Sequence, residues 1–169
     1  MSRSSVVKGL LVLLCGVFVS SVAFAQVVAP PPTPYGTPIN LETAKRAAAA
    51  AAAEARKLNV PMAIAVVDPS GMLVYLEKLD GVQYGSVDVS IDKARSAALF
   101  KRPTKMFYDA VIKGGEGWRF LGLRGAVPVE GGNPLVVDGR IIGAIGLSGG
   151  SGAQDDECGR AGVAAVAKS

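Results

Sequence analysis

Histidine is absent from all 169 residues of the sequence. Without an imidazole, the chain cannot form a histidine metal cluster, a Ser-His-Asp triad or a Cys-His catalytic pair. Most hydrolase mechanisms therefore lose their general base. The sequence also contains neither a GxxxxGK[ST] loop nor a GxGxxG motif between a strand and a helix, which argues against nucleotide binding.

Cysteine occurs only at positions 15 and 158. Cys15 lies in a segment typical of a signal peptide, in which two cations precede an apolar run over residues 9–22 and the small-residue motif Ala23-Phe24-Ala25. An uncleaved anchor is the alternative, but a spanning helix needs about 20 apolar residues. We expect residues 1–25 to be removed, the protein to be periplasmic or secreted, and the mature chain not to remain inserted in a membrane.

The remaining thiol, Cys158, has no intrachain partner after cleavage, and its place among alanines and glycines favours burial. Cleavage also lowers the formal net charge from +4 to +2, because residues 1–25 hold two cations and no acid. A charge this small and dispersed argues against a nucleic-acid partner.

The segment 26–39 predicts an extended linker, because it contains five prolines, at positions 30, 31, 32, 34 and 38. Residues 40–169 are expected to form one domain. Apolar periodicity predicts four helices, over residues 41–58, 86–100, 104–112 and 154–167. Two hairpins turn at Asp68-Pro69-Ser70-Gly71 and at Asp138-Gly139, and residues 127–130 are expected to begin the last part of the sheet.

The element order predicts an α/β/α sandwich around a five-stranded antiparallel sheet. In the second hairpin, Gly143 and Gly146 leave gaps that a helix or a ligand could approach. The alanine-rich face of the first helix permits close packing, either on its own sheet or between subunits. Glycines on both sides of Trp118 predict a mobile loop over a site, or a loop in which Trp118 plugs a thin core.

Three motifs resemble the GlcG/HbpS family of small haem-binding proteins, to which the C-terminal domain of PduO-type proteins is related. They are Ala63-Ile-Ala-Val-Val-Asp-Pro-Ser-Gly71, Asp92-Lys-Ala-Arg-Ser-Ala-Ala-Leu-Phe-Lys-Arg-Pro-Thr104, and the run from Gly131-Gly-Asn-Pro-Leu through Asp138-Gly-Arg-Ile-Ile-Gly-Ala-Ile-Gly-Leu-Ser-Gly-Gly150 to Gln154-Asp-Asp-Glu157. The resemblance covers residues 41–168. It implies an α+β, profilin-like fold, haem or a related tetrapyrrole as ligand, and a homo-oligomer.

The first candidate site is Lys101-Arg102-Pro103-Thr104-Lys105, where three cations surround a predicted helix start that favours an anion such as a propionate, a phosphate or a carboxylate. A solvated basic elbow between two helices is the alternative. By resemblance, Thr104 lies near the ligand pocket with Lys101, Arg102 and Lys105. Without histidine, the axial ligand stays open: the Thr104 hydroxyl would ligate iron only weakly, and the other candidates are Tyr84, Tyr108, Met72, Met106 and Cys158.

The second candidate is Asp155-Asp156-Glu157, which could hold a hard cation or instead complement the dipole of the helix that begins there. Neither a metal nor a catalytic residue can be assigned from the sequence.

Three functions remain open. The first is an exported protein that binds haem or a related tetrapyrrole for binding, sensing, storage or slow degradation, and we favour this non-enzymatic role. The second is an enzyme acting on a small acidic metabolite, held by Lys101, Arg102 or Arg95 with Glu116 or Asp92 as base. The third is an oligomeric interaction module without a small ligand.

Overall fold

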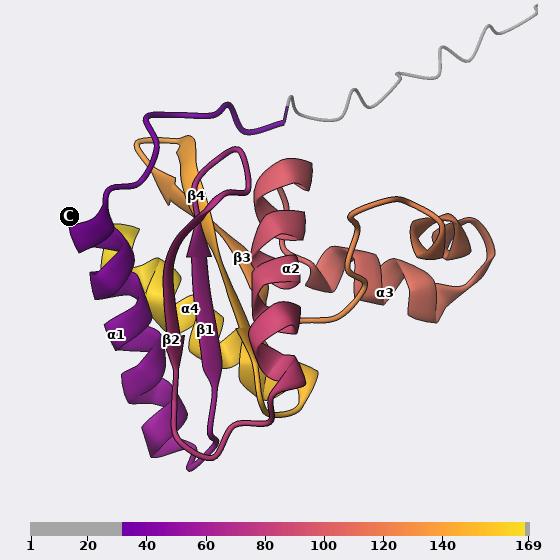
Figure 1. The fold of residues 1–169 in the computed structure, drawn as a ribbon. Helices are drawn as coiled ribbons and strands as arrows, with labels where there is room; N and C mark the ends of the chain where they lie inside the picture. The colour runs from indigo at the N-terminus through magenta and orange to yellow at the C-terminus, as the bar shows by residue number, and fades with distance from the viewer. Residues whose placement is uncertain (1–31, 168–169) are drawn as a thin grey trace, which may run out of the picture. The chain divides into compact units, whose positions relative to one another are not determined.

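The structure is a computed structural model that describes residues 32–167. The predicted signal peptide and the first part of the predicted linker lie outside the described residues. Along the described chain the elements are α1 (Leu41–Lys57), β1 (Ala63–Val67), β2 (Leu73–Lys78), α2 (Gly85–Phe100), α3 (Lys105–Lys113), the 3-10 helix η1 (Gly115–Leu121), β3 (Gly132–Val137), β4 (Arg140–Ser148) and α4 (Gly152–Ala167) (Figure 1).

The described part of the chain contains one antiparallel sheet, with the strand order β2-β1-β4-β3. Both predicted hairpins are confirmed, but the sheet has four strands and not five. The residues expected to begin a further strand fail to pair because the Val127 N–H donates to the Ser96 hydroxyl on α2, at 3.0 Å. Pro128, which follows, has no N–H to donate.

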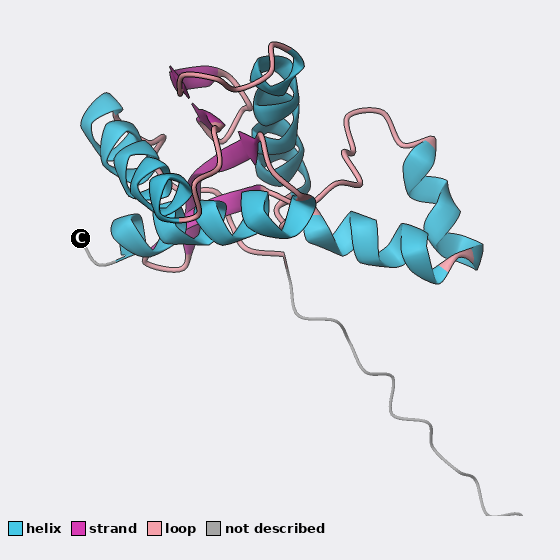
Figure 2. Ribbon diagram, turned by 90° about the horizontal axis from the view of Figure 1, so that it is seen from below, coloured by secondary structure: helices cyan, strands magenta, loops and turns pink. Residues whose placement is uncertain are grey.

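The sheet lies between two helical layers, with α1 and α4 on one face and α2 on the other (Figure 2). The five residues of β1 are all buried. Because side chains alternate along a strand, Ile64 and Val66 pack in the cluster under α1 and α4, whereas Ala65 and Val67 pack under α2. The predicted sandwich of helices around an antiparallel sheet is therefore present.

The alanine face of α1 packs inside its own domain. Asn40 caps the helix by accepting a hydrogen bond from the Thr43 N–H at 2.8 Å. Six alanines of α1 are then buried in the cluster shared with α4 and the sheet: Ala44, Ala47, Ala48, Ala51, Ala52 and Ala55. The interpretation of this face as packing on the protein's own fold is confirmed, and these residues are not available to another subunit.

The last residues of the predicted linker join the domain. Residues 34–39, called the strap, run beside β4, where Tyr35 bridges Ile141 and the Ile39 N–H donates to the Ile142 carbonyl at 2.7 Å. Ile39 itself is buried in the core. The strap is thus part of the folded unit rather than a free tether.

The chain between α2 and β3 forms a projecting arm, residues 105–125, which contains α3 and η1 and extends away from the sandwich (Figures 1 and 2). The predicted mobile loop is a 3-10 helix over most of its length. Trp118 is 63% exposed, so the interpretation of Trp118 as a plug of the core is wrong. Within residues 32–167, no helix has the length and apolar character needed to span a membrane.

The gap at Gly146 is filled by α2. A Cβ atom at Gly146 would overlap the carbonyl oxygen of Ser90 and the backbone nitrogen of Ala94. The glycine therefore sets how closely α2 approaches β4, and it does not leave room for a ligand.

We expect Gly146→Ala to destabilise the domain by about 1–3 kcal/mol, because the added methyl group must displace the backbone of α2. Urea denaturation of the variant measures this cost. Gly85→Ala is the matched control, because a Cβ atom at Gly85 has no neighbour within 4 Å. Equal stability of both variants would contradict the role given to Gly146.

Candidate functional site

The elbow, residues 101–105, joins α2 to the arm. Lys101 adopts a left-handed backbone conformation with φ 56° and ends α2. Its Nζ lies 4.1 Å from the centroid of the Tyr35 ring, and the Tyr35 hydroxyl donates to the Ala98 carbonyl at 2.9 Å. Lys101 therefore faces the strap through a cation–π contact.

Arg102 lies beside a group of phenylalanines. Its Nε donates to the Phe100 carbonyl at 3.0 Å, and its Cζ is 5.7 Å from the Phe107 ring centroid. The Phe107 ring lies 5.4 Å from the Phe100 ring in an edge-to-face arrangement and 5.0 Å from the Phe120 ring. These contacts bring the end of α2, the start of α3 and the end of η1 together.

A cavity of about 500 Å³ opens between these elements and is called the aromatic cavity. Its lining consists of apolar groups and two guanidinium groups: Phe100, Arg102, Phe107, Arg119, Phe120, Gly122 and Leu123. The Arg119 Cζ lies 5.0 Å from the Phe120 ring centroid. The Arg119 Nη1 lies 4.0 Å from the Oε2 of Glu116, whose side chain is exposed. Weak pairing of this kind leaves Arg119 able to meet an anionic ligand.

Thr104 lies at the base of the elbow and is fully buried. Its hydroxyl oxygen accepts a hydrogen bond from the Gly132 N–H at 2.9 Å, and the Thr104 N–H donates to the Gly132 carbonyl at 2.9 Å. This double connection fixes the elbow to the start of β3. In this structure the hydroxyl faces the protein backbone and does not point to a cavity where a ligand could bind. Contact between Thr104 and a ligand stays a prediction.

Lys105 is engaged by two carboxylates. Its Nζ lies 2.7 Å from Asp109 and 3.0 Å from Glu130, and the hydrogen bonds to these carboxylates raise the pKa of Lys105. The charge of Lys105, the third cation of the elbow, is therefore already paired with two carboxylates. Of the four predicted site residues, only Arg102 lines the aromatic cavity.

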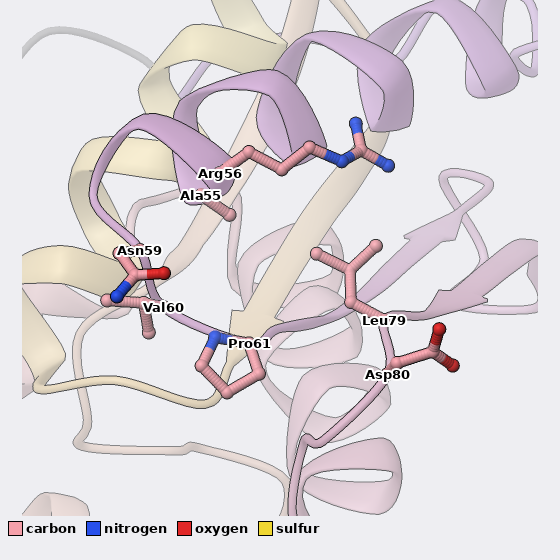
Figure 3. Close-up of a pocket in the computed structure, with 7 residues that line it drawn as sticks. All are labelled: Ala55, Arg56, Asn59, Val60, Pro61, Leu79 and Asp80. Carbon is pink, nitrogen blue, oxygen red and sulfur yellow. The ribbon is translucent and has the colours of Figure 1, made fainter.

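Lys101 lies instead at a smaller cavity of about 290 Å³ on the strap side of the elbow, which is also lined by Thr33, Pro103, Asn133 and Arg160. A third cavity, of about 430 Å³, lies at the end of α1 (Figure 3). It is lined by Arg56 and Asp80 with Leu79 between them in the close-up, and it contains no aromatic side chain.

The other iron-ligand candidates do not gather at the aromatic cavity, which is lined by none of Tyr84, Tyr108, Met72, Met106 and Cys158. The residues expected of an enzyme site are also dispersed. Asp92 is exposed on α2, Glu116 is exposed on η1, and the Arg95 Nε donates to the Gly71 carbonyl at 3.0 Å.

The acidic cluster at the start of α4 is divided among different partners. Asp155 is buried and forms an ion pair with Lys93 at 2.6 Å. Asp156 accepts hydrogen bonds from Asn133 and Arg160, and Glu157 is exposed. Within residues 32–167, no group of three or more acidic or cysteine side chains could hold a metal ion. The cluster thus serves the fold rather than a cation.

Lys93 is the residue that sequence reasoning missed here. Its side chain is 1% exposed, and its Nζ donates to the Leu147 carbonyl at 2.8 Å as well as to Asp155. Burial raises the pKa of Asp155, and the hydrogen bond and charge of Lys93 act in the opposite direction. Each charge is therefore needed to compensate the other.

We expect Lys93→Met to destabilise the domain by about 3–5 kcal/mol, because Asp155 would remain as an uncompensated buried charge. The double variant Lys93→Met/Asp155→Leu is expected to lose less than the two single variants together. Chemical denaturation of the three variants checks both statements. Additive losses would show that the two side chains are not coupled.

Cys158 is buried and free, as the sequence predicts. Burial raises the pKa of its thiol from 9.0 to about 11. Between these two pH values the unfolded chain ionises the thiol and the folded chain does not, so this residue makes stability fall as the pH rises.

We therefore expect the free energy of unfolding to fall more between pH 9 and pH 11 in the wild-type domain than in the Cys158→Ala variant. Denaturant titrations at both pH values measure this difference. A thiol reagent such as DTNB should modify the wild-type protein only after urea unfolds it. Fast modification of the folded protein would mean that the thiol is accessible.

Known proteins are similar to this chain in sequence and in fold. A family model described as "Haem degrading protein HbpS-like" matches residues 39–164. The chain belongs to this HbpS-like family. Protein GlcG of Escherichia coli K12 is 41% identical over 100 residues, which cover 59% of this chain and 73% of GlcG.

Two solved structures extend the HbpS-like similarity to the backbone. The PduOC:heme complex superposes with a TM-score of 0.70 at 27% identity, covering 77% of this chain and 96% of PduOC. A double mutant of HbpS from Streptomyces reticuli superposes with a TM-score of 0.70 at 30% identity, covering 84% of this chain and 97% of HbpS. The relation to GlcG, HbpS and PduO-type proteins inferred from the motifs is confirmed.

Proposed function

We propose that this HbpS-like chain binds haem or a closely related tetrapyrrole in the aromatic cavity. The observation that carries the proposal is the combination of three phenylalanines with two arginines around one cavity of about 500 Å³. Similarity to the PduOC:heme complex supports the choice of ligand. The role would be binding, storage, sensing or slow degradation of the ligand after export.

The residues fit the periphery of a haem. Phe100 and Phe120 offer aromatic surface to the porphyrin face, and burying such apolar surface contributes about 25 cal/mol per Å². Arg102 and Arg119 would meet the two propionates, because guanidinium and carboxylate groups form charge-assisted hydrogen bonds. Bound haem would supply redox-active iron in a site of this kind.

The lining residues do not supply an iron ligand. Phenylalanine, arginine, glycine and leucine side chains do not ligate haem iron, and the sequence has no histidine. Affinity would therefore come from the porphyrin face and the propionates. Lys101, Thr104 and Lys105 remain proposed site residues, with Lys101 on the strap side of the elbow and Lys105 between carboxylates.

Residues 26–169 contain all helices and strands described above. We expect a haemin titration of this chain, followed by Soret absorbance, to saturate at one haemin per chain. Arg102→Ala/Arg119→Ala should weaken binding roughly ten- to a hundredfold, because two charge-assisted contacts are lost. A linear response without saturation, identical in wild type and variant, would reject haem as the ligand.

Arg56→Ala is the matched control for this titration, because it removes a guanidinium from the distant cavity at the end of α1 (Figure 3). Its affinity should equal that of the wild type. If Arg56→Ala weakens binding as much as the double variant does, the effect is one of net charge and the assignment to the aromatic cavity is wrong.

A further inference from the structure

The cavity on the strap side of the elbow, called the strap-side cavity, is distinct from the aromatic cavity, and no residue lines both. Its lining comes from the residues before the strap, the elbow, the hairpin of β3 and β4, and α4. The volume of about 290 Å³ lies just below the range of about 300–1,000 Å³ in which small-molecule sites usually lie. The strap-side cavity is therefore too small for a porphyrin and has room for a molecule of a few carbon atoms.

Lys101 brings a positive charge to the strap-side cavity that no carboxylate compensates. Its Nζ contacts the neutral ring of Tyr35, 4.1 Å from the centroid. Among residues 32–167, no acidic side chain forms an ion pair with Lys101. An anion that enters the cavity would therefore meet an ammonium group that is held in place but is not neutralised.

Arg160 is the second cation of the lining, and a buried acid orients it. The Arg160 Nη1 donates to Oδ2 of Asp156, and the other oxygen of this carboxylate accepts a hydrogen bond from the Asn133 side chain at 3.1 Å. Asp156 and Asn133 are 4% and 6% exposed. Within the described part of the chain, the remaining N–H groups of Arg160 have no partner. A guanidinium carries donors on more than one edge, so Arg160 can bind Asp156 and a ligand together.

The remaining lining and the sum of the charges restrict the class of ligand. Most of the other lining residues are apolar: Pro103, Pro134, Val136, Ile141 and Val163. Lys101 and Arg160 supply two positive charges, and Asp156 cancels one of them. A monoanion restores neutrality, and the apolar side chains favour a ligand with a hydrocarbon part. A dianion such as phosphate would leave an excess charge beside walls that offer it few hydrogen bonds.

We propose that the strap-side cavity binds a free short-chain monocarboxylate. Its carboxylate would lie between the Lys101 ammonium and the unpaired edge of Arg160, and its hydrocarbon chain would pack against Val136 and Val163. This second ligand site does not depend on haem binding. A propionate group of a haem has the same chemistry, so the experiment must separate a free acid from a haem propionate.

A titration of the chain of residues 26–169 with butyrate, followed by ¹H–¹⁵N NMR, tests the proposal. We expect saturation with a dissociation constant of roughly a millimolar or below, with the largest shifts at the Asn133 side-chain amide and at Lys101 and Val163. Butyramide has the same shape without the charge, and it should bind at least tenfold more weakly. Shifts that do not saturate, or equal affinity for butyramide, would overturn the proposal.

Two variants test the cations separately. Lys101→Met keeps the apolar stem of the side chain, and Arg160→Lys keeps a cation for Asp156 but lacks the second edge of donors. Each should weaken butyrate binding roughly ten- to a hundredfold, and circular dichroism checks that each is folded. Arg56→Ala is the matched control, because it removes a guanidinium from the cavity at the end of α1 (Figure 3). Unchanged affinity in either cavity variant, or an equal loss in Arg56→Ala, would contradict the site.

Haemin separates this inference from the proposed function. We expect the haemin-saturated chain to bind butyrate in calorimetry with unchanged affinity, and Arg160→Lys to leave the haemin titration unchanged, because the two cavities share no residue. Displacement of butyrate by haemin would overturn the inference, since the cavity would then receive a haem propionate. Absence of haemin binding would reject the proposed function alone, because the butyrate titration decides this inference by itself.

Discussion

Lys93 and Asp155 bring two charges into a region from which water is excluded, and neither is tolerated there without the other. The Lys93 ammonium also bonds the Leu147 carbonyl, so one side chain connects α2, β4 and α4. Gly131 must pass close by, because a Cβ atom there would lie 2.7 Å from the Asp155 Cβ and 3.2 Å from the Lys93 Nζ. Gly132 follows and exchanges two hydrogen bonds with Thr104. The position of the elbow therefore depends on the ion pair through a short chain of backbone contacts.

Most of the fold could be predicted because its signals are local. Asn40 caps α1 through its own side chain, and Asp138-Gly139 supplies the positive φ of the second hairpin. The extra strand failed because the Val127 N–H has a partner 31 residues away, in Ser96, which no local pattern indicates. Lys93 was missed for a similar reason: a lysine on a helix normally lies in solvent, and only its partner 62 residues later explains its burial.

The candidate site shows the same division. The three cations of the elbow were visible in the sequence, and Arg102 does line the aromatic cavity. The charges of the sequence could not reveal that Lys105 forms an ion pair with Glu130, or that Lys101 contacts the ring of Tyr35. The phenylalanines at 100, 107 and 120 lie on three different elements, and only the fold brings the rings of 100 and 120 to within 5.4 Å of the ring of 107. The fold therefore places Lys101 and Arg102, which share a motif, at different cavities. It brings together phenylalanines that share no motif.

The strap is attached to α2 as well as to β4. Tyr35 donates to the carbonyls of Ala98 and Leu99, at the same end of α2 from which the elbow begins. Residues 34–36 are also held to β4, because the Gly36 N–H donates to the Ile141 carbonyl at 2.8 Å and the Ile141 N–H donates to the Pro34 carbonyl at 2.9 Å. A load applied to the strap would therefore be shared between β4 and the last turn of α2, from which the elbow begins.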